Sequence, residues 1–465
     1  MWPPNRAPRI RIVWMLLALI VPATYVGAQE LEISVSPSPV GSGARAAGMG
    51  DAFVAIADDA TAASWNPAGL IQLERPEISI VGAYTGVIER FSADEHSEVD
   101  SWNRADTPQL NFLSLTYPIP YLFFDRNLVV GIYYQYKYDF ARDFSIEYDA
   151  AWGSEGGLLN TFSKLDFEQE GALHAITPAF AFEITKHLAL GVGLNLWRST
   201  PLGRNEWEQR MDRRTLALMP VACELTRTKT REKYSDVRGE SYTAGLLWNL
   251  SDRWSLGARY DSAWTAKADF KREEFTVRSY FAPWGGSYLG IEPGLRNESR
   301  EIRFPATLAV GAAVRVDDRL TLSADISRTD WNDFWYRSRW GGRTSLVNTW
   351  SFDDFLFPAH FDPTYTVRFG GEYVAIPKQP DVTLKRLWSF RGGLFYDQEP
   401  ASGTPDNFYG LAAGIGLLLN QRVNIDLAYQ LRCGFDVNGD FVRGISGFDE
   451  DVFQNRFLLS TVIYF

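Results

Sequence analysis

The sequence contains very little cysteine or histidine, and this scarcity removes several kinds of site from consideration. The two cysteines, Cys223 and Cys433, are too few for a disulfide framework and lack a metal-binding spacing, although they could still pair with each other. The four histidines show no metal or nucleophile–base spacing: His96, His174, His187 and His360. We therefore expect no metal centre, no cofactor and no enzyme. A Ser/His pair assembled only in space is the alternative.

The sequence also lacks an excess of basic charge. Its net charge of −11 argues against a nucleic-acid partner, because nucleic-acid phosphates require a basic protein face. Beyond the N-terminus, no segment has the ~20 consecutive apolar residues of a membrane-spanning helix. No linker or low-complexity stretch divides the 465 residues into separate domains. One large, closed architecture is the simplest interpretation.

The N-terminus has the pattern of a secretory signal peptide. Three arginines, Arg6, Arg9 and Arg11, precede an apolar run over residues 12–21. Small residues at 26–28 then supply a cleavage site. A membrane anchor is the alternative, but the run is short and is followed by proline. We predict a signal peptide over residues 1–28 and export into the periplasm.

Aromatic residues reach 14% of the sequence, and they could either be buried in a core or form the interfacial girdles of a membrane barrel. The periodicity of the sequence distinguishes between these two explanations. Stretches of about ten residues with period-two alternation are separated by turns that are alternately short and long, which is typical of a transmembrane β-barrel. The barrel is predicted over residues 78–465. The fourteen predicted strands span 78–88, 109–118, 127–138, 172–184, 187–200, 240–249, 253–264, 303–315, 319–329, 364–376, 386–397, 408–419, 422–433 and 455–465.

The alternating faces indicate an apolar exterior and a polar lumen. In residues 188–196, leucine and valine share one face while alanine, glycine and asparagine share the other. Both signs of charge occur on the predicted lumenal face, which favours a mutually neutralising interior over an ion-selective one. These positions are Arg259, Asp261, Asp325, Arg368, Glu372, Arg391, Asp426 and Arg432.

The last strand, residues 457–465, ends on the aromatic Phe465 in register with its alternation. This arrangement resembles the C-terminal signal that the outer-membrane barrel assembly machinery recognises. Outer-membrane lipids and this machinery are therefore expected partners, and the outer membrane of a Gram-negative-type cell is the expected location.

Residues 29–77 precede the barrel and are predicted to form a small N-terminal hatch. Glycine-containing residues 41–50 do not form a dinucleotide-binding motif, because no strand precedes them and no acidic residue follows at the required spacing. The segment instead resembles the hatch of the FadL/TodX family of outer-membrane transport proteins, through Arg45–Gly50, Ala57–Thr61 and Asn66–Gly69. Residues 331–334 and 391–400 extend the resemblance toward the C-terminus.

This resemblance implies a fourteen-stranded barrel, plugged by the hatch, that passively carries hydrophobic molecules such as long-chain fatty acids or aromatic hydrocarbons. It also implies release through a lateral opening in the wall. PorV-like proteins share the hatch motif yet serve in protein secretion or attachment. A non-transporting secretion component is therefore the alternative function.

The hatch and wall supply the candidate functional residues. Asn66, Pro67 and Ala68 are expected to form a structural latch, with asparagine in a turn and proline fixing φ. Gly131 is the candidate for the lateral opening, because glycine weakens a strand. The apolar hatch residues either line a ligand pocket or fill the lumen: Phe53, Val54, Ile56, Trp65 and Leu70. Asp436, Asn438 and Asp440 form either a calcium loop or an outer turn.

Overall fold

The computed structural model describes residues 38–39, 41–94, 96–122, 125–152, 159–220, 222–283, 286–337, 343–344, 361–377, 385–401, 404–437 and 447–465. The predicted signal peptide, residues 1–28, lies outside this part of the chain, as do Asn438 and Asp440. Among the described residues, no helix has both the length and the apolarity needed to cross a membrane.

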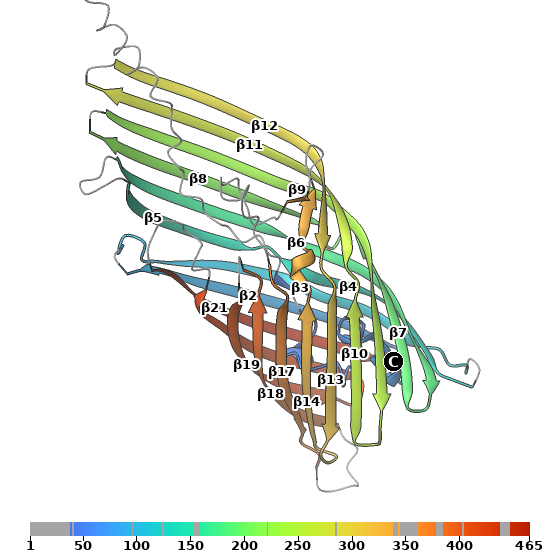
Figure 1. The fold of residues 1–465 in the computed structure, drawn as a ribbon. Coiled ribbons are helices and arrows are strands. Elements are labelled where there is room, and N and C mark those ends of the chain that lie inside the picture. Colours follow the sequence, from blue (N-terminus) through green and yellow to red (C-terminus); the bar gives the residue numbers. More distant parts are fainter. Residues whose placement is uncertain are drawn as a thin grey trace, which may run out of the picture.

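Fourteen antiparallel strands form a closed barrel (Figure 1). The barrel closes where the last strand pairs with the first, from Glu77↔Tyr464 to Ala93↔Phe448. Each predicted strand overlaps one of the fourteen observed strands, so the sequence-based count is confirmed. They are β2 (Glu77–Ala93), β3 (Ser101–Pro118), β4 (Leu128–Asp139), β6 (Leu159–Thr185), β7 (Leu188–Trp197), β9 (Ala222–Asn249), β10 (Trp254–Asp261), β13 (Thr307–Arg315), β14 (Leu320–Thr329), β17 (Thr364–Val374), β18 (Arg386–Glu399), β19 (Asp406–Leu419), β20 (Val423–Val437) and β21 (Phe448–Tyr464).

The predicted long outer loops on one side of the barrel are instead strands, and they form a sheet that we call the wing. Its order is β5–β6–β8–β9–β11–β12, where the first halves of β6 and β9 continue from the barrel without a break. In Figure 1 the wing projects obliquely from the end opposite the short turns. The strands found only in the wing are β5 (Arg142–Trp152), β8 (Glu206–Met219), β11 (Trp264–Ala282) and β12 (Gly286–Phe304).

The sequence-based search missed the wing, in which β8 and the first half of β9 are largely polar on both faces. In β9, the outward-facing Arg227, Lys229 and Arg231 alternate with Thr228 and Thr230. The period of two is present in charge but not in hydrophobicity, which was the signal used. Cross-strand ion pairs hold this surface together, such as Arg231 Nε to Glu208 Oε1 at 2.7 Å.

The remaining elements are short. Two helical segments, α2 (Ala44–Gly48) and α3 (Ala62–Trp65), and the 3-10 helix η1 (Pro67–Gln72) precede the barrel. The 3-10 helix η2 (Trp331–Asp333) follows β14. Short strands pair at the margins of the sheet: β1 (Ser38–Pro39), β15 (Trp335–Arg337) and β16 (Arg343–Thr344).

Two further sequence candidates lie on strands. Cys223 and Cys433 are both free thiols, so the pairing left open by the sequence is absent from the structure. Asp436 lies near the end of β20 with a φ of 52°, a left-handed conformation that aspartate tolerates in turns. Because Asn438 and Asp440 lie outside the described residues, calcium binding here stays a prediction.

The barrel wall is apolar outside and polar inside, which confirms the predicted faces. Leu427 on β20 is 50% exposed on the outer surface, whereas its neighbour Asp426 points inward and is only 1% exposed. Leu190, Leu194 and Ile425 also face outward. In water, such a surface would expose many large apolar side chains, but it suits contact with lipid.

We expect Leu427→Arg to destabilise the barrel by about 2–4 kcal/mol, because the charge would lie in the hydrocarbon layer. Thr366→Arg is the matched control, since Thr366 lines the lumenal cavity and donates a hydrogen bond to Asp397. Asp426 would be a poor control because it forms a buried ion pair. Denaturant titration of the refolded protein measures both changes, and a larger loss for Thr366→Arg would contradict the assignment of the faces.

Candidate functional site

Residues 41–73, which we call the hatch, lie against the inner wall of the barrel. Helix α2 packs on β19, β20 and β21, while η1 packs on β6, β7 and β9. Most hatch side chains are buried, including those of Ala44, Phe53 and Leu70. Wall side chains also bind the hatch backbone. Gln430 Nε2 donates to the Ala47 carbonyl at 3.0 Å, and Ser460 Oγ accepts from the Ala44 amide at 2.7 Å.

The hatch backbone approaches the wall most closely over three cross-strand pairs of glycines. Gly191 pairs with Gly245, Gly257 with Gly311, and Gly370 with Gly393. A Cβ atom added at Gly245 would lie 2.1 Å from Asn66 Oδ1. One added at Gly257 would lie 2.3 Å from the Val54 carbonyl oxygen, and one at Gly393 would lie 2.3 Å from the Gly50 amide nitrogen. Only glycine lets the two backbones come this close.

Asn66 joins the hatch to the wall through its side-chain amide. Its Nδ2 donates to the Val54 carbonyl at 2.8 Å and to the Leu246 carbonyl of β9 at 3.0 Å. Its Oδ1 accepts from the Ala68 amide at 3.2 Å, which caps η1. The backbone of Asn66 is extended, with φ −162°, so the turn conformation expected from the sequence is absent. The asparagine is used for its hydrogen bonds instead.

The two residues that follow Asn66 complete this contact. Pro67 occupies the first turn of η1, where its missing N–H costs no hydrogen bond. Ala68 is buried and packs in a small apolar cluster with Ala189 and Leu247 of the wall. The structure therefore brings the three predicted motif residues together at one place, on the inner side of β7 and β9.

A chain of buried ion pairs links the hatch to the opposite side of the wall. Arg45 of the hatch pairs with Asp58 and, through two nitrogens, with Glu372 of β17. Arg391 of β18 bridges Glu372 at 2.7 Å and Asp426 at 2.6 Å. Since a buried charge is costly unless paired, these residues hold one another in place. The predicted neutralising interior is confirmed, with the addition of a cation from the hatch.

A cavity of about 250 Å³ lies in the lumen beside the hatch. One part of its wall is aromatic, with Trp65, Tyr138, Trp197, Trp264 and Trp331. The rest is polar and carries both signs of charge. The polar lining includes Lys137, Asp139, Arg259, Asp261, Arg368, Asp397, Glu399, Arg432 and Arg456.

Of the five apolar hatch residues proposed from the sequence, only Trp65 lines this cavity. Phe53, Ile56 and Leu70 are buried in the cluster between hatch and wall, and Val54 is buried over Gly311. Trp65 is fixed by a hydrogen bond from its Nε1 to the Ser42 carbonyl at 2.8 Å. The other four residues therefore pack the plug in this structure.

The sequence-based search missed the aromatic side chains that join the cavity to the wing. The rings of Trp197 and Trp264 stack with centroids 4.3 Å apart, and Trp264 stacks on Phe304 at 4.6 Å. Tyr138 lies beside Trp197, with centroids 5.7 Å apart. These residues come from β4, β7, β11 and β12, so no local motif joins them. The only sequence signal was the high aromatic content, for which a buried core was one of two explanations.

The barrel wall is continuous at Gly131, but it is interrupted farther along β3 and β4, on the side of the wing. Gly131 pairs with Thr116 on one side and with Ala179 on the other. The side chain of Tyr133 lies across Gly131, and a Cβ atom added at Gly131 would lie 2.2 Å from Tyr133 Oη. Only glycine fits at this position. Pairing of β3 with β4 ends at Phe112↔Gln135, and Asn111 next to it is a buried bulge residue.

Strand β1 and the first residues of the hatch lie in this break between β3 and β4. Ser38 and Pro39 pair with Asp139 and Tyr138 of β4, at a level where β3 no longer pairs with β4. Asn111 holds the same segment from the side of β3. Its Oδ1 accepts from the Gly43 amide at 3.2 Å and its Nδ2 donates to the Gly41 carbonyl at 3.0 Å.

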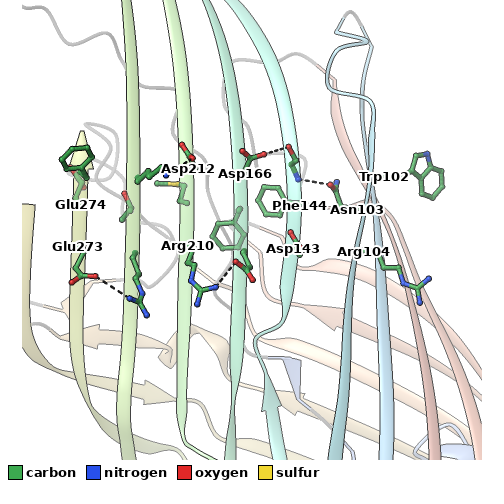
Figure 2. A pocket seen from close by; sticks show the side chains of 18 residues that line it. Trp102, Asn103, Arg104, Asp143, Phe144, Asp166, Arg210, Asp212, Glu273 and Glu274 are labelled. Carbon is green, nitrogen blue, oxygen red and sulfur yellow. Dashed lines mark hydrogen bonds and ion pairs between the residues drawn. The ribbon is translucent and has the colours of Figure 1, made fainter. Parts of the chain in front are cut away.

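A larger cavity of about 910 Å³ is on the wing and not in the lumen (Figure 2). It crosses several strands, with Trp102 and Arg104 at one end and Glu273 and Glu274 at the other. Its central charges pair with one another, as Arg210 does with Glu168 at 3.0 Å. Because this cavity lies on the wing, whereas the lumenal cavity lies inside the barrel beside the hatch, the lumenal cavity is the better candidate site.

We expect Gly393→Ala to weaken the docking of the hatch, because its methyl group would overlap the hatch backbone, at a cost of roughly 1–3 kcal/mol. Gly392→Ala is the matched control, since a Cβ there would meet no atom closer than the Ala412 oxygen at 4.0 Å. Limited proteolysis of the hatch measures the difference. Equal protection of the hatch in both variants would contradict the importance of the close approach.

Comparisons with known proteins agree with this geometry. A family model described as outer membrane protein transport protein (OMPP1/FadL/TodX) matches residues 40–439. No curated protein matches the chain. A FadL homologue from Pseudomonas aeruginosa is 17% identical with a TM-score of 0.55, over 92% of this chain and 100% of its own.

Two toluene transporters have the same fold at a similarly low sequence identity. TodX of Pseudomonas putida is 15% identical with a TM-score of 0.54, over 93% of this chain and 100% of its own. TbuX of Ralstonia pickettii is 15% identical with a TM-score of 0.51, over 91% and 98%. At these identities the structures establish the fold alone, and neither they nor the family model favour the secretion alternative. Because the family model covers most of the sequence, this chain belongs to the FadL/TodX family of outer-membrane transport proteins.

Proposed function

We propose that this chain is a passive channel that carries hydrophobic molecules inward across the outer membrane, past the hatch. The observation that carries the proposal is the lumenal cavity, which is walled by aromatic rings and floored by a plug docked on glycines. An apolar molecule entering the cavity gains ~25 cal/mol per Å² of apolar surface removed from water. Such a channel needs no energy source beyond the gradient of its substrate.

The lining of the cavity favours substrates with an apolar body and a polar end, such as long-chain fatty acids, over plain aromatic hydrocarbons. Trp197 and Trp264 offer flat apolar surfaces on one side. On the polar side, Lys137 and Arg368 have no ion pair with any residue that the structure describes. These two cations could meet the charge of a carboxylate without displacing an existing partner.

The exit that we propose is the break between β3 and β4, not Gly131. Asn111 and the N-terminal segment fill this break, so their movement would open a lateral path from the lumen to the lipid. A lateral exit would spare an apolar substrate the passage through water below the hatch. The exit that we propose therefore lies on the same pair of strands as Gly131, but beyond Phe112↔Gln135, where their pairing ends.

Lipids and the barrel assembly machinery are the proposed partners of the exterior. The outward-facing leucines and aromatic residues would contact the lipid tails. Strand β21, which closes the barrel against β2 and carries exposed Phe457 and Leu459, would be the strand recognised during assembly. Both assignments rest on the sequence pattern and on the exposure of these side chains.

We expect cells that lack this chain to take up less radiolabelled long-chain fatty acid, and cells that carry Asn66→Ala to show the same defect with a folded barrel. The substitution removes the amide that joins hatch and wall. Asn297→Ala on the exposed face of the wing is the matched control and should leave uptake unchanged. Unchanged uptake of every apolar compound tested in the deleted strain would instead favour a role in secretion.

We also expect deletion of residues 41–70 to open an ion-conducting pore, because the hatch fills the lumen below the cavity. Single-channel conductance in a planar bilayer measures this directly. The deletion protein must first migrate as a folded barrel on an unheated gel. A folded deletion protein that conducts no better than the intact chain would show that the hatch does not close the pore.

A further inference from the structure

Three possible metal ligands from two separate segments meet at the outer rim, away from the lumen. His96 and Glu98 belong to the connection between β2 and β3, and Asp149 belongs to β5 of the wing. His96 Nδ1 lies 2.7 Å from Glu98 Oε1 and 3.1 Å from Asp149 Oδ1. The ligand atoms of the three residues all lie within 4.8 Å of one another. One imidazole nitrogen thus faces two carboxylates at once.

Among the described residues, the two carboxylates of this cluster have His96 as their one ion-pair partner. No lysine or arginine of the described chain forms an ion pair with Glu98 or Asp149. A divalent cation bound among the three ligand atoms would supply the positive charge that no neighbouring lysine or arginine provides.

Packing on both sides holds the ligands in position. Val99, next to Glu98, and Tyr148, next to Asp149, are both buried in one apolar cluster with Phe91 and Phe144. A hydrogen bond from the Val99 amide to the His96 carbonyl at 3.0 Å closes the turn that carries His96. Because the neighbouring residues are anchored, the ligands would need little rearrangement to bind an ion, which favours binding.

The ligands remain open to solvent on one side. The side chains of His96, Glu98 and Asp149 are 26%, 35% and 46% exposed. Three protein ligands of one nitrogen and two oxygens, with room for water at the remaining positions, match the preferences of zinc and similar ions. Calcium prefers more ligands, all of them oxygen.

We propose that His96, Glu98 and Asp149 bind one divalent transition-metal ion, such as Zn²⁺, on the outer face of the protein. The ion would join the β2–β3 connection to β5 and so fasten the wing to the rim of the barrel. This site is separate from the transport path and does not depend on the proposed function.

Titration of the full-length, detergent-solubilised protein with ZnCl₂ in a calorimeter tests this proposal. We expect one saturable site, whose affinity falls by roughly tenfold or more in His96→Ala and in Asp149→Asn. His187→Ala is the matched control, because His187 is an exposed histidine in the short turn between β6 and β7, at the opposite end of the barrel. Excess CaCl₂ should not displace the zinc.

Protease cleavage within the β2–β3 connection supplies a second measurement. Zinc should slow this cleavage in the intact chain and in His187→Ala, but not in His96→Ala. Each variant is first checked for the gel migration of a folded barrel. The proposal is overturned if no saturable zinc binding occurs, if calcium displaces the zinc, or if His187→Ala weakens binding as much as His96→Ala does.

Discussion

The close approach of two backbones, that of the hatch and that of the barrel wall, is the constraint on which the rest of the interior depends. At each cross-strand glycine pair the hatch occupies the space that a side chain would otherwise fill. This contact brings Asn66 within reach of the Leu246 carbonyl and Arg45 within reach of Glu372. Without the glycines, the same hydrogen-bonding groups would stand too far from the wall to meet.

Charge and aromatic packing divide the interior into two regions that follow from this docking. Near the hatch, Arg45, Glu372, Arg391 and Asp426 neutralise one another, so the plug is held by charges that are costly to separate. Farther out, Trp197, Trp264 and Phe304 form a stacked aromatic surface beside the cavity. The first region fixes the hatch against the wall, and the second is the surface on which we propose that hydrophobic molecules bind.

The wing shows how one barrel can carry a second sheet without a second domain. Strands β6 and β9 run from the wall directly into the wing, and Gly171 marks the passage in β6 with a φ of 134°, which L side chains rarely adopt. The outer face of the wing is charged, and ion pairs such as Lys164–Glu147 cross between its strands. Its inner face is apolar near the rim, where Val99 and Tyr148 are buried. The wing therefore extends the barrel as a direct continuation of two of its strands.

By itself, the sequence determined the fourteen-stranded barrel, the direction of its faces and the identity of the family, because alternation, turn length and the Asn66-Pro67-Ala68 motif are local properties of the chain. It did not locate the wing, in which β8 and the first half of β9 lack an apolar period, nor show that four of the five apolar hatch residues pack between the hatch and the wall. Only the tertiary structure decided where the wall is broken. Each of β3 and β4 is a continuous strand in the sequence, and the break lies in the pairing between them. It also decided which residues meet in the lumenal cavity and at His96, because these residues come from distant segments that closure of the barrel and packing of the wing bring together.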